Sequence, residues 1–166
     1  MLTDQLLQDI QEYIELHTIV ERFSSKHMIE AEVCESALPD FYELDDFIHH
    51  HKKPTFREVL FSYMDDSGEK DAAVYTRAGL DRRHFSKIRG KRDYKPKKDT
   101  VIALALALRL DMDQTDELLT SAGYSLSQSD DYDLIIQYFI EKQTYDIGLI
   151  NEALYALKGR TLAGAV

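Results

Sequence analysis

Apolar residues recur at spacings of three and four along nearly the whole chain, which is the period of an amphipathic helix. The first such segment covers residues 3–24, with Thr3 or Asp4 placed as its N-cap. A second helix is expected over residues 27–37, and Pro39 closes it because proline disrupts a helix interior. A shorter helix follows this proline, with apolar positions at Phe41, Leu44 and Ile48.

A clear boundary follows at Pro54. Thr55 and Glu58 have the spacing of a capping box, in which each side chain satisfies a backbone amide at the helix start. The pattern predicts a helix over residues 55–66, broken by Ser67-Gly68. Its expected buried side chains are Phe56, Val59, Leu60 and Tyr63.

Two short helices come next, over residues 69–77 and 82–89. The first ends at Gly79, since glycine readily takes the left-handed geometry of a helix C-terminus. Asp81 is expected to cap the second. A fourth helix begins near Pro96 and is apolar on almost every side, which predicts the centre of a bundle.

The remaining sequence predicts three more helices and no strand. Asp113 is expected to cap a fifth helix of the central block, which Gly123 stops. A C-terminal pair follows over residues 127–142 and 146–158, with Gly159 at its end. The chain is therefore predicted to be all-α.

Charge is distributed very unevenly along the chain. The formal net charge of the 166 residues is -10, yet residues 82–98 hold nine Lys/Arg and one Asp. Residues 1–50 carry 12 acids and 2 bases, and residues 111–166 carry 10 acids and 3 bases. An acidic protein with one basic stretch is expected to meet a polyanion on one face only, although such a stretch can also be a solvated helix face.

Several protein classes are excluded by what the sequence lacks. It has no apolar run long enough to span a bilayer and no signal-like N-terminus, so we expect a cytoplasmic protein without a membrane partner. No catalytic motif occurs, and we expect neither an enzyme nor a cofactor. Adjacent His49, His50 and His51 lack the spacing of three or four that one helix face needs for a metal, so no metal site is expected.

The segment from Lys70 to Tyr124 has a further pattern, KDAAVYTRAGLDRRHFSKIRGKRDYKPKKDTVIALALALRLDMDQTDELLTSAGY. It resembles the XRE family, the lambda-repressor-like helix-turn-helix proteins. Ala73 takes the place of the family's small residue, Gly79 lies in the turn, and Phe85 and Ile88 match its buried pair. The loop IRGKRDYKP departs from the family pattern, because its glycine comes one residue early and the usual acid is missing.

The resemblance implies a fold and a division of the chain. The fold is a five-helix lambda-repressor-like helix-turn-helix bundle with an N-terminal helical extension and a C-terminal helical pair. Residues 1–53 would be an acidic segment for dimerisation or partner binding, and residues 54–124 the DNA-binding domain. Residues 125–166 would be a helical pair packed on that domain.

The resemblance also implies which residues meet double-stranded DNA. With Phe85 and Ile88 inward, the first turns of their helix would enter the major groove, where an arginine can donate two parallel bonds to guanine. Asp81 is expected to act as a cap, and Tyr94 to pack under the loop. The expected base contacts are Arg82, Arg83, His84 and Lys87. The expected phosphate contacts are Lys70, Ser86, Arg89, Lys91, Arg92, Lys95, Lys97 and Lys98, with Ser67 as a further candidate near the start of the preceding helix.

The sequence thus favours a transcriptional regulator, acting as a repressor and binding a palindromic site as a homodimer. The alternative is a protein-interaction module that keeps the helix-turn-helix fold and meets a protein partner through its acidic N-terminal helices. RNA is a weaker third candidate. Tyrosines of the C-terminal pair could complete the core, which we favour, or form a dimer interface: Tyr132, Tyr138, Tyr145 and Tyr155.

Overall fold

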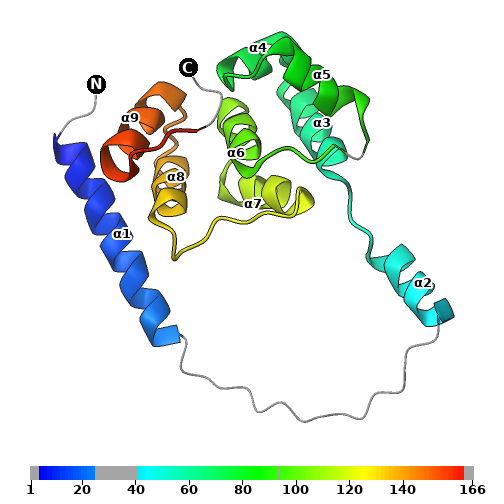
Figure 1. Cartoon of the computed structure of the whole chain (residues 1–166), viewed down its shortest axis with the longest axis horizontal. Helices are drawn as coiled ribbons and strands as arrows, with labels where there is room; N and C mark the ends of the chain where they lie inside the picture. Colours follow the sequence, from blue (N-terminus) through cyan, green and yellow to red (C-terminus); the bar gives the residue numbers. More distant parts are fainter. Residues whose placement is uncertain (1–3, 25–40, 93, 163–166) are drawn as a thin grey trace.

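The computed structural model describes residues 4–24, 41–92 and 94–162 (Figure 1). Every regular element in these ranges is an α-helix, which confirms the all-α prediction for this part of the chain. The predicted helix over residues 27–37 lies outside the described residues. The helices are α1 (Asp4–Ser24), α2 (Phe41–His51), α3 (Phe56–Ser67), α4 (Asp71–Arg77), α5 (Arg82–Gly90), α6 (Lys98–Ala107), α7 (Met112–Ser121), α8 (Asp131–Glu141) and α9 (Ile147–Lys158).

The start and end of α3 follow the sequence prediction closely. The Thr55 backbone amide donates to the Glu58 carboxylate at 2.8 Å, and the Glu58 amide donates to the Thr55 hydroxyl at 3.4 Å. Gly68 ends the helix with a φ of 64°, which an L side chain rarely adopts. One burial prediction is wrong: Tyr63 is only half-buried, because its hydroxyl reaches the Glu117 carboxylate, and Met64 is buried instead.

Helix α6 forms the centre of the bundle, as its apolar sequence predicts. Every residue from Thr100 to Ala107 is buried. The helix packs against α4, α7 and α9, so side chains on all of its faces leave water. Its position therefore determines where the surrounding helices lie.

Two predicted helix starts are wrong. Asp111, not Asp113, caps α7, because Gln114 lies three residues after Asp111 and completes a capping box with it at 2.9 and 3.1 Å. Helix α8 begins at Asp131 instead of Ser127. Ser127 precedes the helix, and its backbone amide donates a hydrogen bond to the carboxylate of Asp133, in the first turn of the helix, at 2.8 Å.

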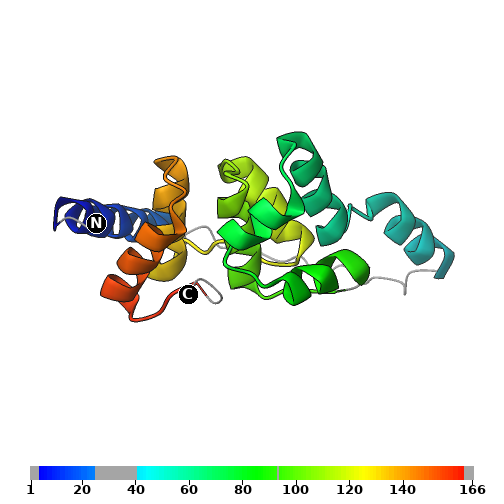
Figure 2. The ribbon, with the colours of Figure 1, turned by 90° about the horizontal axis from the view of Figure 1, so that it is seen from above.

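Helix α1 packs on the C-terminal pair. Ile10 is fully buried, and the Tyr13 hydroxyl donates to the Glu141 carboxylate at 2.7 Å while its ring contacts Tyr138 edge-on. Figures 1 and 2 show α1 beside α8 and α9 at one end of the molecule and α2 at the other end. The two helices described within residues 1–53 therefore lie far apart, and the predicted division into domains stays a prediction.

Core packing accounts for some of the C-terminal tyrosines. Tyr132 and Tyr138 are buried and Tyr145 is half-buried, whereas Tyr155 is 68% exposed. None of the described helices is both long enough and apolar enough to cross a membrane.

Candidate nucleic-acid interface

Helices α4 and α5 are both short and are joined by a tight turn. Gly79 lies in this turn with a φ of 67°, which explains why glycine occupies the position. The Asp81 carboxylate accepts a hydrogen bond from the His84 backbone amide at 2.6 Å, so Asp81 caps α5 as the sequence predicts. This bond holds the pKa of the Asp81 carboxyl below its usual value.

The inner face of α5 consists of the two residues expected there. Phe85 and Ile88 are buried. The Phe85 ring lies 5.4 Å from Tyr75 of α4 and 6.2 Å from Phe61 of α3, measured between ring centroids. Because these contacts fix the rotation of α5, they also decide which of its side chains face water.

The outer face of α5 is strongly cationic. Arg82, Arg83, Ser86 and Lys87 are all exposed. Within the described ranges, no carboxylate lies at ion-pair distance from Arg82, Arg83 or Lys87. Their charges are therefore available to an external anion.

Three of the predicted contact residues are held by the protein itself. Arg89 is exposed but forms an ion pair with Asp71, and its guanidinium lies 5.3 Å from the Phe61 ring centroid. His84 is half-buried, with a ring nitrogen 3.1 Å from the Tyr94 hydroxyl. Tyr94 packs against the core under the loop, as expected. Lys98, the third, belongs to a separate junction.

The loop between α5 and α6 continues the cationic surface. Lys91, Arg92, Lys95 and Lys97 are exposed, and the Lys95 ammonium lies 5.0 Å from the Tyr124 ring centroid. Lys70, the N-cap residue of α4, is exposed, and its side chain makes no capping hydrogen bond. The Ser67 hydroxyl donates a hydrogen bond to the Met64 carbonyl. The loop therefore presents four accessible cations close to the outer face of α5.

Sequence reasoning missed Lys53 as part of this surface. Lys53 lines a surface cavity together with Arg92 and Lys95 from the loop. Lys53 lies about forty residues before Arg92 and Lys95 in the sequence, and only the folded chain brings it beside them. The available signal was the pair Lys52-Lys53 directly before the capping box.

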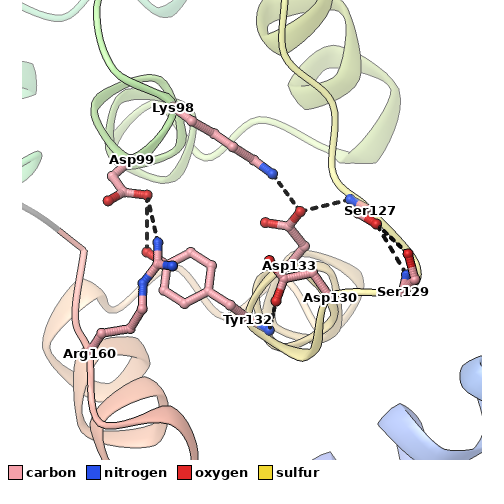
Figure 3. A network of polar contacts seen from close by, with 8 residues as sticks. All are labelled: Lys98, Asp99, Ser127, Ser129, Asp130, Tyr132, Asp133 and Arg160. Atoms are coloured by element: carbon pink, nitrogen blue, oxygen red, sulfur yellow. Dashed lines mark hydrogen bonds and ion pairs between the residues drawn. The ribbon is translucent and has the colours of Figure 1, made fainter.

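Lys98 lies in a polar junction between α6 and α8 (Figure 3). Its ammonium donates to the Asp133 carboxylate at 2.5 Å, and the Asp133 side chain is only 2% exposed. The same carboxylate oxygen accepts the Ser127 amide. Lys98 thus neutralises a buried carboxylate. Its charge is therefore not available to an external anion, whereas the charge of the neighbouring Lys97 is.

The other half of the junction centres on Asp99 (Figure 3). Its carboxylate accepts from the Tyr132 hydroxyl at 3.3 Å and from the Arg160 guanidinium at 3.4 Å. The guanidinium also lies over the Tyr132 ring at 3.7 Å from the centroid. Burial, followed by the nearby Asp99 charge, raises the pKa of Tyr132 to about 12.

The adjacent histidines of α2 make contacts within their own helix. Ring nitrogens of His50 and His51 each lie 2.8 Å from a backbone carbonyl one turn earlier. Among the described residues, no group of three His, Cys, Asp or Glu is arranged to hold a metal ion.

Comparisons with known proteins return no relative. No family model matches the chain, and no curated protein and no solved structure is significantly similar to it. The resemblance to the XRE family therefore stays a prediction that rests on the residues quoted above.

Proposed function

We propose that this protein is a sequence-specific DNA-binding regulator that acts through α4 and α5 as a helix-turn-helix. The observation that carries the proposal is the outer face of α5, where Arg82, Arg83 and Lys87 are exposed without a carboxylate partner in the described ranges. Phe85 and Ile88 anchor the helix on its opposite side. A rigid helix with a free cationic face suits the major groove, which admits an α-helix.

The arrangement around α4 and α5 supports a lambda-repressor-like reading of α3–α7. Helix α6 runs through the centre, α3 packs on α7, and α4 packs on both α5 and α6. In this reading the core of the DNA-binding domain lies within residues 54–124. One such domain makes few base contacts, so a homodimer on a palindromic site is the economical form of binding.

The structure changes the roles that we propose for individual residues. Arg82 and Arg83 remain the readers of base edges, with Lys87 beside them. Lys70, Ser86, Lys91, Arg92, Lys95 and Lys97 remain phosphate contacts. His84, Arg89 and Lys98 are assigned instead to internal contacts, because each is engaged by a protein group.

A selection experiment tests the proposal. Duplexes bound by the purified chain are recovered from a random pool, and their affinity is measured as a function of salt. We expect an enriched site whose binding weakens steeply as salt rises. The variant with Arg82, Arg83 and Lys87 replaced by alanine should lose this binding while its thermal unfolding stays unchanged. An empty selection, or full binding by the triple variant, would contradict the proposal.

A second candidate function is a protein-interaction module, and α2 is the observation that favours it. None of its residues is buried, and four apolar side chains at spacings of three or four form one exposed face. Carboxylates flank this face, which suits a basic partner. An empty selection would favour this candidate over DNA binding. The face consists of Phe41, Leu44, Phe47 and Ile48, and the carboxylates are Glu43, Asp45 and Asp46.

A further inference from the structure

A surface trough lies between the basic loop, the start of α3 and the end of α7. It has a volume of about 560 Å³, and its charged lining residues are Lys53, Arg92 and Lys95. The polar residues Thr55, Thr120, Ser121 and Tyr94 also line it. We call this feature the cationic trough. It joins the segment before α3 to the loop after α5, which are about forty residues apart.

Among the described residues, no carboxylate lines the cationic trough, and this distinguishes it from a second cavity that Arg92 also lines. That second cavity, of about 310 Å³, contains Glu58 and Asp65 beside its arginines. Its charges are therefore largely balanced within the protein. The trough gathers three cations with no carboxylate among its described lining residues, whereas an adjoining cavity that Lys53 also lines holds Asp116 and Glu117. An anion that enters the trough is attracted by all three positive charges.

The cationic trough continues along the loop. A neighbouring cavity of about 510 Å³ is lined by Lys91 together with Arg92, Tyr94 and Lys95, three of which also line the trough. The cations therefore form a path, not a single point. A path of separated cations fits a ligand with repeated negative charges better than it fits one small anion.

We propose that the cationic trough binds the backbone phosphates that flank the DNA operator, with Lys53 as a contact from outside the helix-turn-helix. This inference rests on the proposed function and extends it to the segment that links α2 to α3. Flexible ammonium groups hold phosphate oxygens without reading bases. Lys53 therefore adds affinity and position but no sequence preference, and DNA binding fixes the point where α2 leaves the bundle.

Lys53→Ala and Lys52→Ala form a matched pair that tests this proposal. The two lysines are adjacent and both exposed, but only Lys53 lines the trough. On a selected duplex with long flanks, Lys53→Ala should reduce the slope of log affinity against log salt by about 0.9, the value for one lost phosphate contact. Lys52→Ala should leave the slope unchanged. On a duplex trimmed to the operator, Lys53→Ala should match the unmodified chain.

A linear polyphosphate provides a second probe that does not depend on an operator. In amide NMR spectra of the full chain, it should shift Thr120, Ser121 and Gly123, and Lys53→Ala should weaken these shifts where Lys52→Ala does not. Shifts by polyphosphate without any duplex binding would overturn the DNA proposal but keep an anion site at the trough. If the two variants behaved equally with both probes, the proposal that the cationic trough binds phosphates would be wrong.

Discussion

The molecule has two cationic regions that differ in how their charges are neutralised. On the outer face of α5 and the following loop, arginines and lysines are exposed and form no ion pair among the described residues, and Arg89, which pairs with Asp71, is not part of this face. At the junction of α6 with α8 and residue 160, Lys98 and Arg160 are each paired with a carboxylate. The comparison teaches that a basic sequence run is not one functional unit: adjacent Lys97 and Lys98 belong to different regions.

The energetic consequences of the two regions should also differ. An exposed cation contributes little to folding, because water already solvates it. A cation that neutralises a buried carboxylate matters for folding, because the carboxylate without it would be an unpaired buried charge. We therefore expect substitutions on the outer face of α5 to change binding but not stability. Substitutions at the junction should change stability but not binding.

The largest expected effect is on stability, at Asp133. Asp133→Ala removes the acceptor for both the Lys98 ammonium and the Ser127 amide, and should lower the free energy of unfolding by about 3 kcal/mol. Thermal or urea denaturation measures the loss. Asp131→Ala, two positions earlier on the same helix, breaks a more exposed pair with Lys158 and should cost less than about 1 kcal/mol. Equal losses would show that the junction is no more important than a surface pair.

The next effect is on binding, at Arg82. Arg82→Ala should weaken binding to a selected duplex about tenfold to a hundredfold and relax the preference at one base pair, while the unfolding transition stays in place. Arg82→Lys keeps the charge but not the two parallel hydrogen-bond donors. It should therefore recover the salt dependence but not the base preference. If Arg82→Lys kept the full preference, Arg82 would be a phosphate contact.

The smallest effect concerns alkaline pH, at Tyr132. Its pKa, raised by burial to about 12, lies above the value of about 10 for an unfolded tyrosine. The protonated phenol therefore stabilises the fold below pH 10, and this contribution is lost as the pH rises from about 10 to 12. Tyr132→Phe should make that part of the stability curve less steep, while Tyr63, whose pKa is also raised to about 12, accounts for part of the remaining slope. Tyr155→Phe, at an exposed position, is the control and should leave the curve unchanged.

Local signals in the sequence predict much of this fold. The capping box at Thr55, the cap at Asp81 and the turn glycine at Gly79 act within three or four residues, so their spacing is visible in the sequence alone. The inward positions of Phe85 and Ile88 follow from helical period. The Asp113 prediction failed because several acids compete near that helix start, and only the Gln114 side chain favours Asp111.

Contacts between distant segments account for what the sequence does not predict. Lys98 looks like its neighbours in the basic run, and Asp133, its partner, lies 35 residues away. Lys53 joins the loop cations only after folding. The amphipathic pattern of α2 predicts an apolar face, but periodicity alone says nothing about whether another element covers it.

The salt dependence of DNA binding by Lys97→Ala and Lys98→Ala tests the central distinction most directly. Both variants lose one positive charge at adjacent positions, so their effect on net charge is identical. We predict that Lys97→Ala reduces the slope of log affinity against log salt by about 0.9 with unchanged stability. Lys98→Ala should keep the slope and lower the free energy of unfolding. Equal slopes and equal stabilities for the two variants would contradict the account.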